Sequence, residues 1–268
     1  MKKRFLSLLL VPTLLLVACK GAKISEEKAK ELANKITEHT ESLDGASFEM
    51  TVKVKSAEGK GENREENNIT YTLSQDKNEN IKLKVKGNDG DEKYDFVIYS
   101  VKNDKYEEVS YIKDYNLETK AYNEYVYAKN ATDDYSSKTT SYSIHALAPA
   151  IIIAGLADPV KLMEGDDFSQ EEVVEDGLTF KTDVNYYSNG EKNMTIEAVR
   201  KLIEGEPEEG DEVSIEYKYL ITYDNLVFKK AVINGKSNYG NTSEVRASLE
   251  FKGVKIELPK NWESLLNK

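Results

Sequence analysis

A two-residue alternation of apolar and polar side chains recurs along most of this chain and constrains its fold more than any other feature. In residues 48–54, apolar side chains stand at every second position, with charged or hydroxyl side chains between them. Successive side chains of a β-strand point to opposite faces, so this pattern predicts strands with one buried and one wet face. The expected strands span 48–54, 69–73, 81–86, 94–101, 106–112, 121–127, 178–187, 194–203, 213–223, 226–233, 245–251 and 254–258.

The expected strands are joined mainly by turns. Asp176-Gly177, Asn189-Gly190 and Asn234-Gly235 have the composition of hairpin turns, and a further turn is expected at 114–116. Parallel neighbours need a crossover of a dozen or more residues, usually a helix, and the hairpin connections lack one. The sequence therefore predicts one antiparallel sheet. Because most strands have a polar side, the pattern favours a sheet with helices on one face only.

The period changes to that of a helix in residues 26–43. Apolar residues recur there at three- and four-residue spacing, which predicts an amphipathic helix. Ser25 is the expected N-cap, and Asp44-Gly45 is the expected stop signal. Residues 19–25 have no apolar pattern and are expected to form a tether. The apolar stripe of the helix consists of Ala29, Leu32, Ala33, Ile36 and Leu43.

A nearly uncharged insert at residues 141–163 interrupts the strand series. Pro149 predicts two short helical pieces, because proline breaks a helix, and the second is expected to end near 155–159. The run Ile151–Ile153 alone also fits a strand. The apolar residues of the insert are candidates for the wall of a ligand cavity, and they fit ordinary core packing equally well. These candidates are Ile144, Leu147, Ala148, Ile151, Ile152 and Leu156.

The N-terminus has the form of a secretion signal. Three basic residues precede an apolar stretch at 5–18, which is shorter than the roughly 20 residues of a transmembrane helix. The stretch ends in Leu16-Val17-Ala18-Cys19, which resembles the bacterial lipoprotein signal. That resemblance implies a signal peptide at 1–18, diacylation of Cys19 and a lipid anchor at the extracytoplasmic face of the cell membrane. The alternative is a buried thiol after an uncleaved anchor.

The chain is acidic, with 37 basic against 48 acidic residues. Removal of residues 1–18 takes away three cations and no acids, which leaves a formal charge of −14. Such a charge repels anionic phospholipids and nucleic acids. We therefore expect no nucleic-acid partner, and we expect acyl chains at Cys19 to hold the protein at the membrane, where two chains are needed for stable attachment.

The order of these elements resembles the lipoprotein carriers of the LolA/LolB and mycobacterial LppX/LprG type. The resemblance spans nearly the whole mature chain and rests on the signal, the helix, the strand series and the insert, without a residue motif. It implies an α+β fold, in which a strongly curved antiparallel sheet of about 10–12 strands forms an unclosed β-barrel. The helix and the insert would lie on its concave face, within a single half-barrel domain at 26–268. The resemblance also implies a cavity for lipid or acyl chains.

The composition leaves few groups for catalysis or metal binding. The chain has two histidines and one cysteine, so a zinc site would need carboxylates to complete it. His39 is expected to be solvated, and His145 is expected to be packed or at the boundary of the insert. Ser143 stands in no Gly-x-Ser-x-Gly motif, and the acidic stretches lack the spacing of a calcium loop. We therefore expect no enzymatic activity, no cofactor and no metal ion.

The sequence predicts a membrane-anchored bacterial lipoprotein that binds or carries a hydrophobic ligand, a lipid or an acyl chain. The alternative is a surface-exposed interaction or envelope-scaffold lipoprotein that has no internal ligand and contacts an envelope protein with its outer sheet face. The two interpretations differ in whether a void exists between the sheet and the insert.

Overall fold

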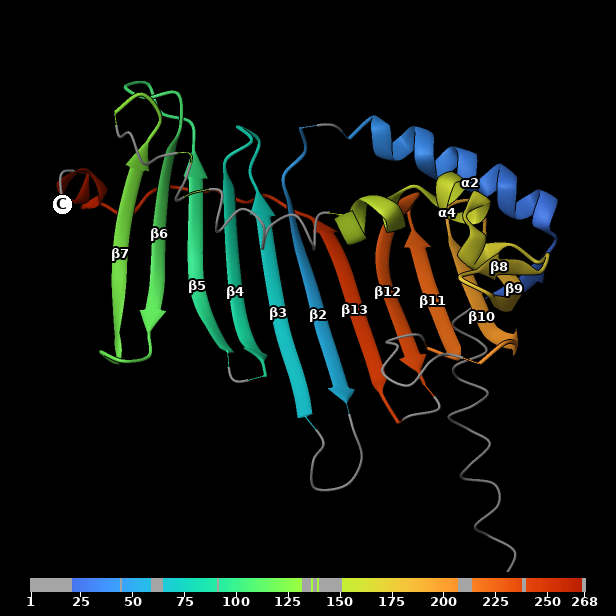
Figure 1. The fold of residues 1–268 in the computed structure, drawn as a ribbon. Helices are drawn as coiled ribbons and strands as arrows, with labels where there is room; N and C mark the ends of the chain where they lie inside the picture. The colour runs from blue at the N-terminus through green and yellow to red at the C-terminus, as the bar shows by residue number, and fades with distance from the viewer. Residues whose placement is uncertain are drawn as a thin grey trace, which may run out of the picture.

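A single antiparallel sheet of thirteen strands organises the part of the chain that the structure describes (Figure 1). The structure is a computed structural model, and it describes residues 21–43, 45–58, 65–90, 92–131, 136, 139, 151–206, 214–237 and 240–266. The strands are β1 (Ala22–Ile24), β2 (Phe48–Glu58), β3 (Glu65–Gln75), β4 (Ile81–Asp89), β5 (Glu92–Val101), β6 (Val109–Asn116), β7 (Ala121–Ala128), β8 (Val173–Glu175), β9 (Leu178–Ser188), β10 (Met194–Glu204), β11 (Glu216–Asp224), β12 (Val227–Lys236) and β13 (Thr242–Phe251).

The sheet joins two series of hairpins through one non-local strand pair. The strand order is β1-β9-β10-β11-β12-β13-β2-β3-β4-β5-β6-β7, and β8 also pairs with β9. The junction is the pairing of β13 with β2, which runs in continuous register from Phe251 opposite Phe48 to Thr242 opposite Ala57. The sheet is strongly curved and unclosed, with β1 and β7 at opposite ends of the order. The predicted α+β fold with a curved, unclosed antiparallel sheet is confirmed.

Helices cover one face of the sheet, mainly over β9–β12. α2 (Glu26–Glu41) begins where predicted, and the Ser25 hydroxyl accepts a hydrogen bond of 3.2 Å from the Lys28 amide as its N-cap. Residues 151–157 are helical and are followed by α4 (Pro159–Glu164) and a 3₁₀ turn, η2 (Asp166–Phe168). Figure 1 shows α2 and α4 side by side above this half of the sheet, and the two helices are in contact.

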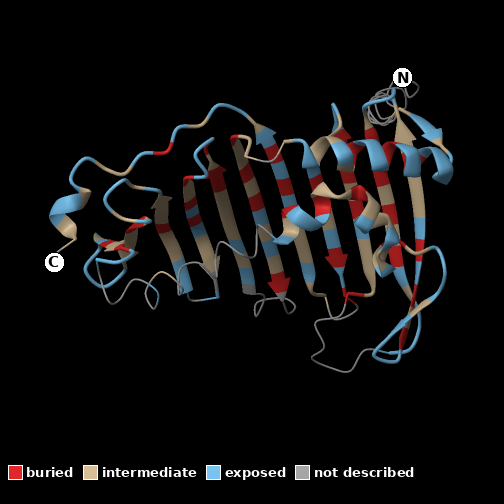
Figure 2. Ribbon diagram, turned by 90° about the horizontal axis from the view of Figure 1, so that it is seen from above, coloured by how far each residue is buried: buried red, intermediate tan, exposed pale blue. Residues whose placement is uncertain are grey.

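The main core lies between these helices and the inner face of the sheet. The buried stripe of α2 consists of Ala29, Leu32, Ala33 and Ile36, four of the five residues that the periodicity predicted. The fifth, Leu43, lies beyond the end of the helix at Glu41 and is only half-buried. The stripe packs with alternate residues of the strands, among them Val52, Ile196 and Ile221, each fully buried. Figure 2 shows buried residues alternating with more exposed ones along these strands. Each such side chain contributes ~1.5–3 kcal/mol by leaving water, and this burial holds the helices on the sheet.

A second, smaller core lies on the opposite face, at the β5–β7 end. Tyr99, Tyr111 and Val126 alternate with the inner-face residues of their strands and so point to the outer face. They pack with the C-terminal segment, residues 252–266, which runs from β13 to a 3₁₀ turn beside β7, η3 (Trp262–Leu265) (Figures 1 and 2). Residues 254–258 were expected to form a strand, but they pair with no neighbour in the sheet. This prediction was wrong. An apolar alternation indicates that one side of an extended segment is buried, but it does not show that the backbone pairs with a neighbouring strand.

Several boundaries also differ from the predictions. Part of the expected tether, Ala22–Ile24, is strand β1, which pairs with β9. β6 begins at Val109 and continues through the turn expected at 114–116, and the turn follows at 117–120. In the insert, Gly155 is helical and the break falls at Asp158, before Pro159. Pro149 and His145 lie outside the described residues. β1 and β8 have three residues each, too few for an alternation to be visible.

Candidate functional site

An apolar groove of about 800 Å³ lies between the inner sheet face, the end of α2 and helix 151–157. This apolar groove is the candidate ligand site. Ten of its fourteen lining residues carry apolar side chains, and the polar ones are Thr40, Glu41 and Gln75. A lining of this kind favours a ligand that is itself mostly apolar, and the volume is within the roughly 300–1,000 Å³ of small-molecule sites. The apolar lining consists of Leu43, Ala46, Phe48, Met50, Leu73, Ile81, Ile153, Ala154, Leu249 and Phe251.

The floor of the groove is set by strand register. Met50 of β2 stands opposite Leu73 of β3 on one side and Leu249 of β13 on the other, so the three side chains form a row on the inner face. One step along the strands, Phe48 stands opposite Phe251, with ring centroids 6.5 Å apart in an edge-to-face arrangement. The floor is therefore built across the non-local β13–β2 junction.

The wall of the groove is the insert, which several polar contacts hold in place. The Tyr223 hydroxyl, on β11, donates a buried hydrogen bond of 2.8 Å to the Leu156 carbonyl oxygen. The Thr37 hydroxyl donates one of 2.9 Å to Asp158, which also caps α4. Burial disfavours the charged form of Asp158, but these hydrogen bonds outweigh it, and its pKa lies below the usual range. Helix 151–157 is thus tied to both the sheet and α2.

Arg200 of β10 holds the segment that follows the insert, η2 and β8, on the sheet. Its side chain is buried, and its two terminal nitrogens donate hydrogen bonds of 2.6 Å to Asp167 of η2 and to Glu175 of β8. Its guanidinium lies 4.1 Å from the centroid of the Phe180 ring. One cation on β10 therefore holds both η2 and β8, which lie 25–33 positions earlier in the chain.

The structure places the candidate wall residues of the insert in different surroundings. Ile151 is 68% exposed, Ile152 is half-buried against the core, and Leu156 is buried within it. The groove is instead lined from this helix by Ile153 and Ala154. Ile144, Leu147 and Ala148 lie outside the described residues. The helical pattern showed which residues are apolar, but the direction each one faces depends on how the helix sits on the sheet.

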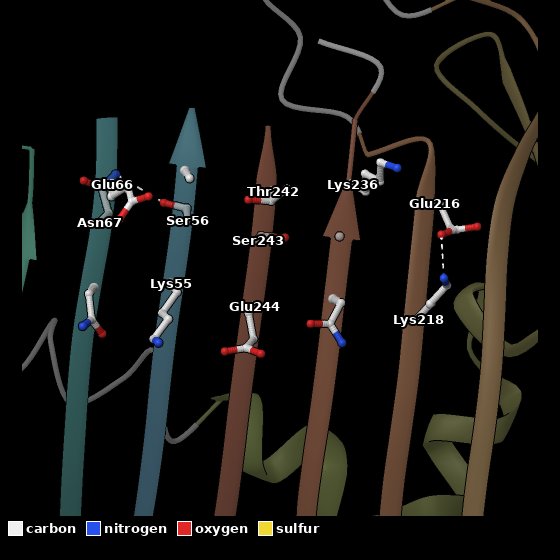
Figure 3. A pocket seen from close by; sticks show the side chains of 14 residues that line it. Lys55, Ser56, Glu66, Asn67, Glu216, Lys218, Lys236, Thr242, Ser243 and Glu244 are labelled. Atoms are coloured by element: carbon white, nitrogen blue, oxygen red, sulfur yellow. Dashed lines mark hydrogen bonds and ion pairs between the residues drawn. The ribbon is translucent and has the colours of Figure 1, made fainter. Parts of the chain in front are cut away.

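A second hollow, of about 610 Å³, lies on the outer face across the ends of β2, β3 and β11–β13 (Figure 3). Its lining is polar and its charges balance, with Lys55, Lys218 and Lys236 beside Glu66, Glu216 and Glu244. Lys218 is 3.0 Å from Glu216, and its hydrogen bond holds the pKa of that carboxyl below the usual range. A hollow with this lining does not suit an apolar ligand.

The described residues contain neither a metal-binding cluster nor a helix that could span a membrane. They contain no group of three or more histidine, cysteine, aspartate or glutamate side chains placed to hold a metal ion. In the same part of the chain, no helix has both the length and the apolar character needed to cross a membrane.

Comparison with known proteins gives only distant matches. No family model matches the chain, and no curated protein matches it. Among solved structures, LprF from Mycobacterium bovis is 11% identical, with 89% of this chain and 99% of that chain covered and a TM-score of 0.30. A LolA superfamily protein from Nitrosomonas europaea is 11% identical, with 83% of this chain and 94% of that chain covered and a TM-score of 0.24. A DUF1329 family protein from Desulfovibrio piger is 9% identical, with 87% of this chain and 94% of that chain covered and a TM-score of 0.22. Because these values are low, the function has to be inferred from the chain's own residues.

Proposed function

We propose that this protein is a lipid-anchored, extracytoplasmic bacterial lipoprotein that binds or carries a lipid or acyl chain in the apolar groove. Cys19 would carry the anchor, and the groove would hold the ligand. The proposal assigns no chemical step to the protein, so the ligand should be recovered unchanged.

The observation that carries the proposal is the apolar lining of the groove. Phe48, Ile81 and Phe251 line the groove and are only half-buried, whereas Met50 beside them is already buried. Apolar surface exposed in water is costly, at about 25 cal/mol per Å², and a bound acyl chain would remove that cost. The insert forms a wall that is anchored at Leu156 and Asp158, so the site is largely preformed.

A pair of tryptophan substitutions tests the ligand site. Ala154 is exposed and lines the groove, so Ala154→Trp should fill the space without disturbing the core. Ile151 stands on the same helix, points into solvent and does not line the groove, so Ile151→Trp is the matched control. With a neutral fluorescent probe such as N-phenyl-1-naphthylamine, we expect Ala154→Trp to weaken binding at least tenfold, about 1.4 kcal/mol, and Ile151→Trp to stay within about twofold.

Native mass spectrometry of protein purified without detergent should show a bound lipid in the wild type and less of it in Ala154→Trp. The ligand site is refuted if the wild type binds neither probe nor lipid, or if the two tryptophan variants bind the probe equally.

The anchor is tested separately. We expect the N-terminal peptide of the membrane-extracted protein to begin at Cys19 and to carry the mass of a diacylglyceryl group. Cys19→Ser should release the protein from the membrane fraction. An unmodified Cys19, or a Cys19→Ser protein that stays in the membrane fraction after a high-salt wash, would contradict the anchor.

A further inference from the structure

The outer face of the sheet carries a patch of lysine and hydroxyl side chains, here called the lysine patch. It follows two neighbouring rows of strand register across β12, β13, β2, β3 and β4, the central strands of the sheet. Paired residues of neighbouring antiparallel strands point to the same face, so each row is continuous. One row is Lys230, Ser248, Thr51, Thr72 and Lys84, and the other contains Arg246, Lys53, Thr70 and Lys86.

The lysines of the patch are exposed and have no carboxylate partner. Among the described residues, none of Lys53, Lys84, Lys86 and Lys230 forms an ion pair. The acids that border the patch are already bound to other groups: Glu244 to Arg246 at 2.7 Å, Glu49 and Glu250 to Lys252 at 2.7 and 3.3 Å, and Asp95 to the Tyr122 hydroxyl at 3.0 Å. Two carboxylate charges remain at the border, because Glu49 and Glu250 share one cation and the tyrosine partner of Asp95 is neutral. The four lysines outnumber these two charges, in a chain whose formal net charge is −11.

We propose that the lysine patch is a docking surface for an anionic lipid bilayer. Net charge alone predicts repulsion from such a surface. However, charges are screened within about 8 Å at physiological salt, so a nearby surface responds to the charges that face it and not to the total. The folded sheet separates the two signs and presents the cations together.

The shape of the patch favours a planar partner. At roughly 4.8 Å per strand, the two rows extend about 19 Å across five strands. The helices lie on the inner face of the sheet, and the lysine patch lies on the opposite face. The choice of a bilayer also rests on the proposed anchor at Cys19, which would hold this face close to a membrane.

Vesicle binding by the unacylated protein tests the patch independently of the anchor. The chain from residue 19, with Cys19→Ser, retains all the described elements, since β1 begins at Ala22. We expect it to bind vesicles of phosphatidylcholine with about one-third phosphatidylglycerol, to ignore vesicles of phosphatidylcholine alone, and to dissociate when salt is raised to about 0.5 M. The triple variant Lys53→Gln, Lys84→Gln, Lys86→Gln should weaken binding on the order of 100-fold, from ~1 kcal/mol per lysine.

The control variant lowers the net charge by the same amount at other places on the surface. The triple variant Lys77→Gln, Lys192→Gln, Lys260→Gln removes three exposed lysines from other parts of the surface, and it should bind within about threefold of the parent chain. Equal losses in both triple variants would overturn the patch. Binding of soluble polyphosphate without binding of anionic vesicles would overturn the bilayer as its partner. Probe binding in the groove should be unchanged in the patch variant, so failure of the groove and failure of the patch are distinguishable.

Discussion

Asp76→Asn should release the C-terminal segment and destabilise the fold. Asp76 is buried in the β3–β4 turn, and its two oxygens accept four hydrogen bonds. Oδ1 accepts from the Asn78 and Asn80 amides at 2.9 and 3.1 Å, and Oδ2 accepts from the Asn80 side chain and the Ile256 amide, both at 3.1 Å. The bond to Ile256 joins residues that are 180 positions apart and ties the C-terminal segment to the sheet.

The size of the effect follows from the donors that lose their acceptor. An asparagine keeps one oxygen for the turn amides, but it places an NH₂ group opposite the Ile256 amide and the Asn80 side chain. Each buried donor left without an acceptor costs ~1–3 kcal/mol, so we expect a loss of about 3 kcal/mol. At roughly 2–4 °C per kcal/mol for a chain of this size, Tm should fall by about 6–12 °C.

The effect should also depend on pH. Burial disfavours the Asp76 carboxylate, but the hydrogen bonds outweigh burial, and its pKa lies below the usual value. A carboxyl whose pKa is lower in the folded state contributes its full stabilisation above the unfolded pKa of about 3.9, and that contribution disappears as pH falls through the folded pKa. The free energy of unfolding of Asp76→Asn should therefore differ from that of the wild type by the whole of this amount near pH 7, and the difference should shrink below about pH 4.

Calorimetry measures the loss, and the single tryptophan reports its location. Trp262 lies in the C-terminal segment with its ring 6.4 Å from that of Tyr106, so detachment should shift its emission toward that of a solvated indole. Asp104→Asn, in an exposed turn, is the control and should leave Tm unchanged. The reasoning is refuted if Asp76→Asn and Asp104→Asn unfold at the same temperature with the same Trp262 emission.

Two further substitutions test the attachment of the insert and of the segment that follows it. Tyr223→Phe removes the buried hydrogen bond to the Leu156 carbonyl, so urea unfolding should show a loss of about 1–2 kcal/mol in the free energy of unfolding. Probe binding should also weaken, because helix 151–157 is less firmly held. Unchanged stability and binding would argue against this contact as an anchor. Arg200→Met removes the cation shared by Asp167 and Glu175, and we expect a loss of about 2 kcal/mol with faster proteolysis of residues 165–177. If Arg200→Met is as stable as wild type and no more sensitive to protease, packing alone holds these elements.

The elements that local pattern predicts correctly are those whose signal lies within a few residues. The alternation over 48–54, the cap at Ser25 and four of the five residues of the α2 stripe were confirmed, because burial of one side is visible as a period in the sequence. The run at 151–153, which also fitted a strand, is helical. The three-residue strands β1 and β8 were missed because so short a segment shows no period.

The candidate site was less accessible to prediction. The sequence indicated an apolar insert facing a curved sheet, but it pointed to Ile151 and Leu156 for the wall, whereas Ile153 and Ala154 line the groove. The direction of each side chain depends on the rotation of the helix, which Tyr223 and Thr37 set from distant elements through their bonds to Leu156 and Asp158. No local signal reports that rotation.

By itself, the amino-acid sequence determined the kinds of element, their order and the apolar side of most of them, since each follows from the spacing of neighbouring residues. Only the tertiary structure decided that β13 pairs with β2, and that pairing places Phe48 beside Phe251 in the groove and Lys53 beside Arg246 on the outer face. The physical reason is that strand pairing uses backbone groups which are the same in every residue other than proline. The choice of partner is therefore made by how the whole chain buries its apolar surface, and not by any local motif.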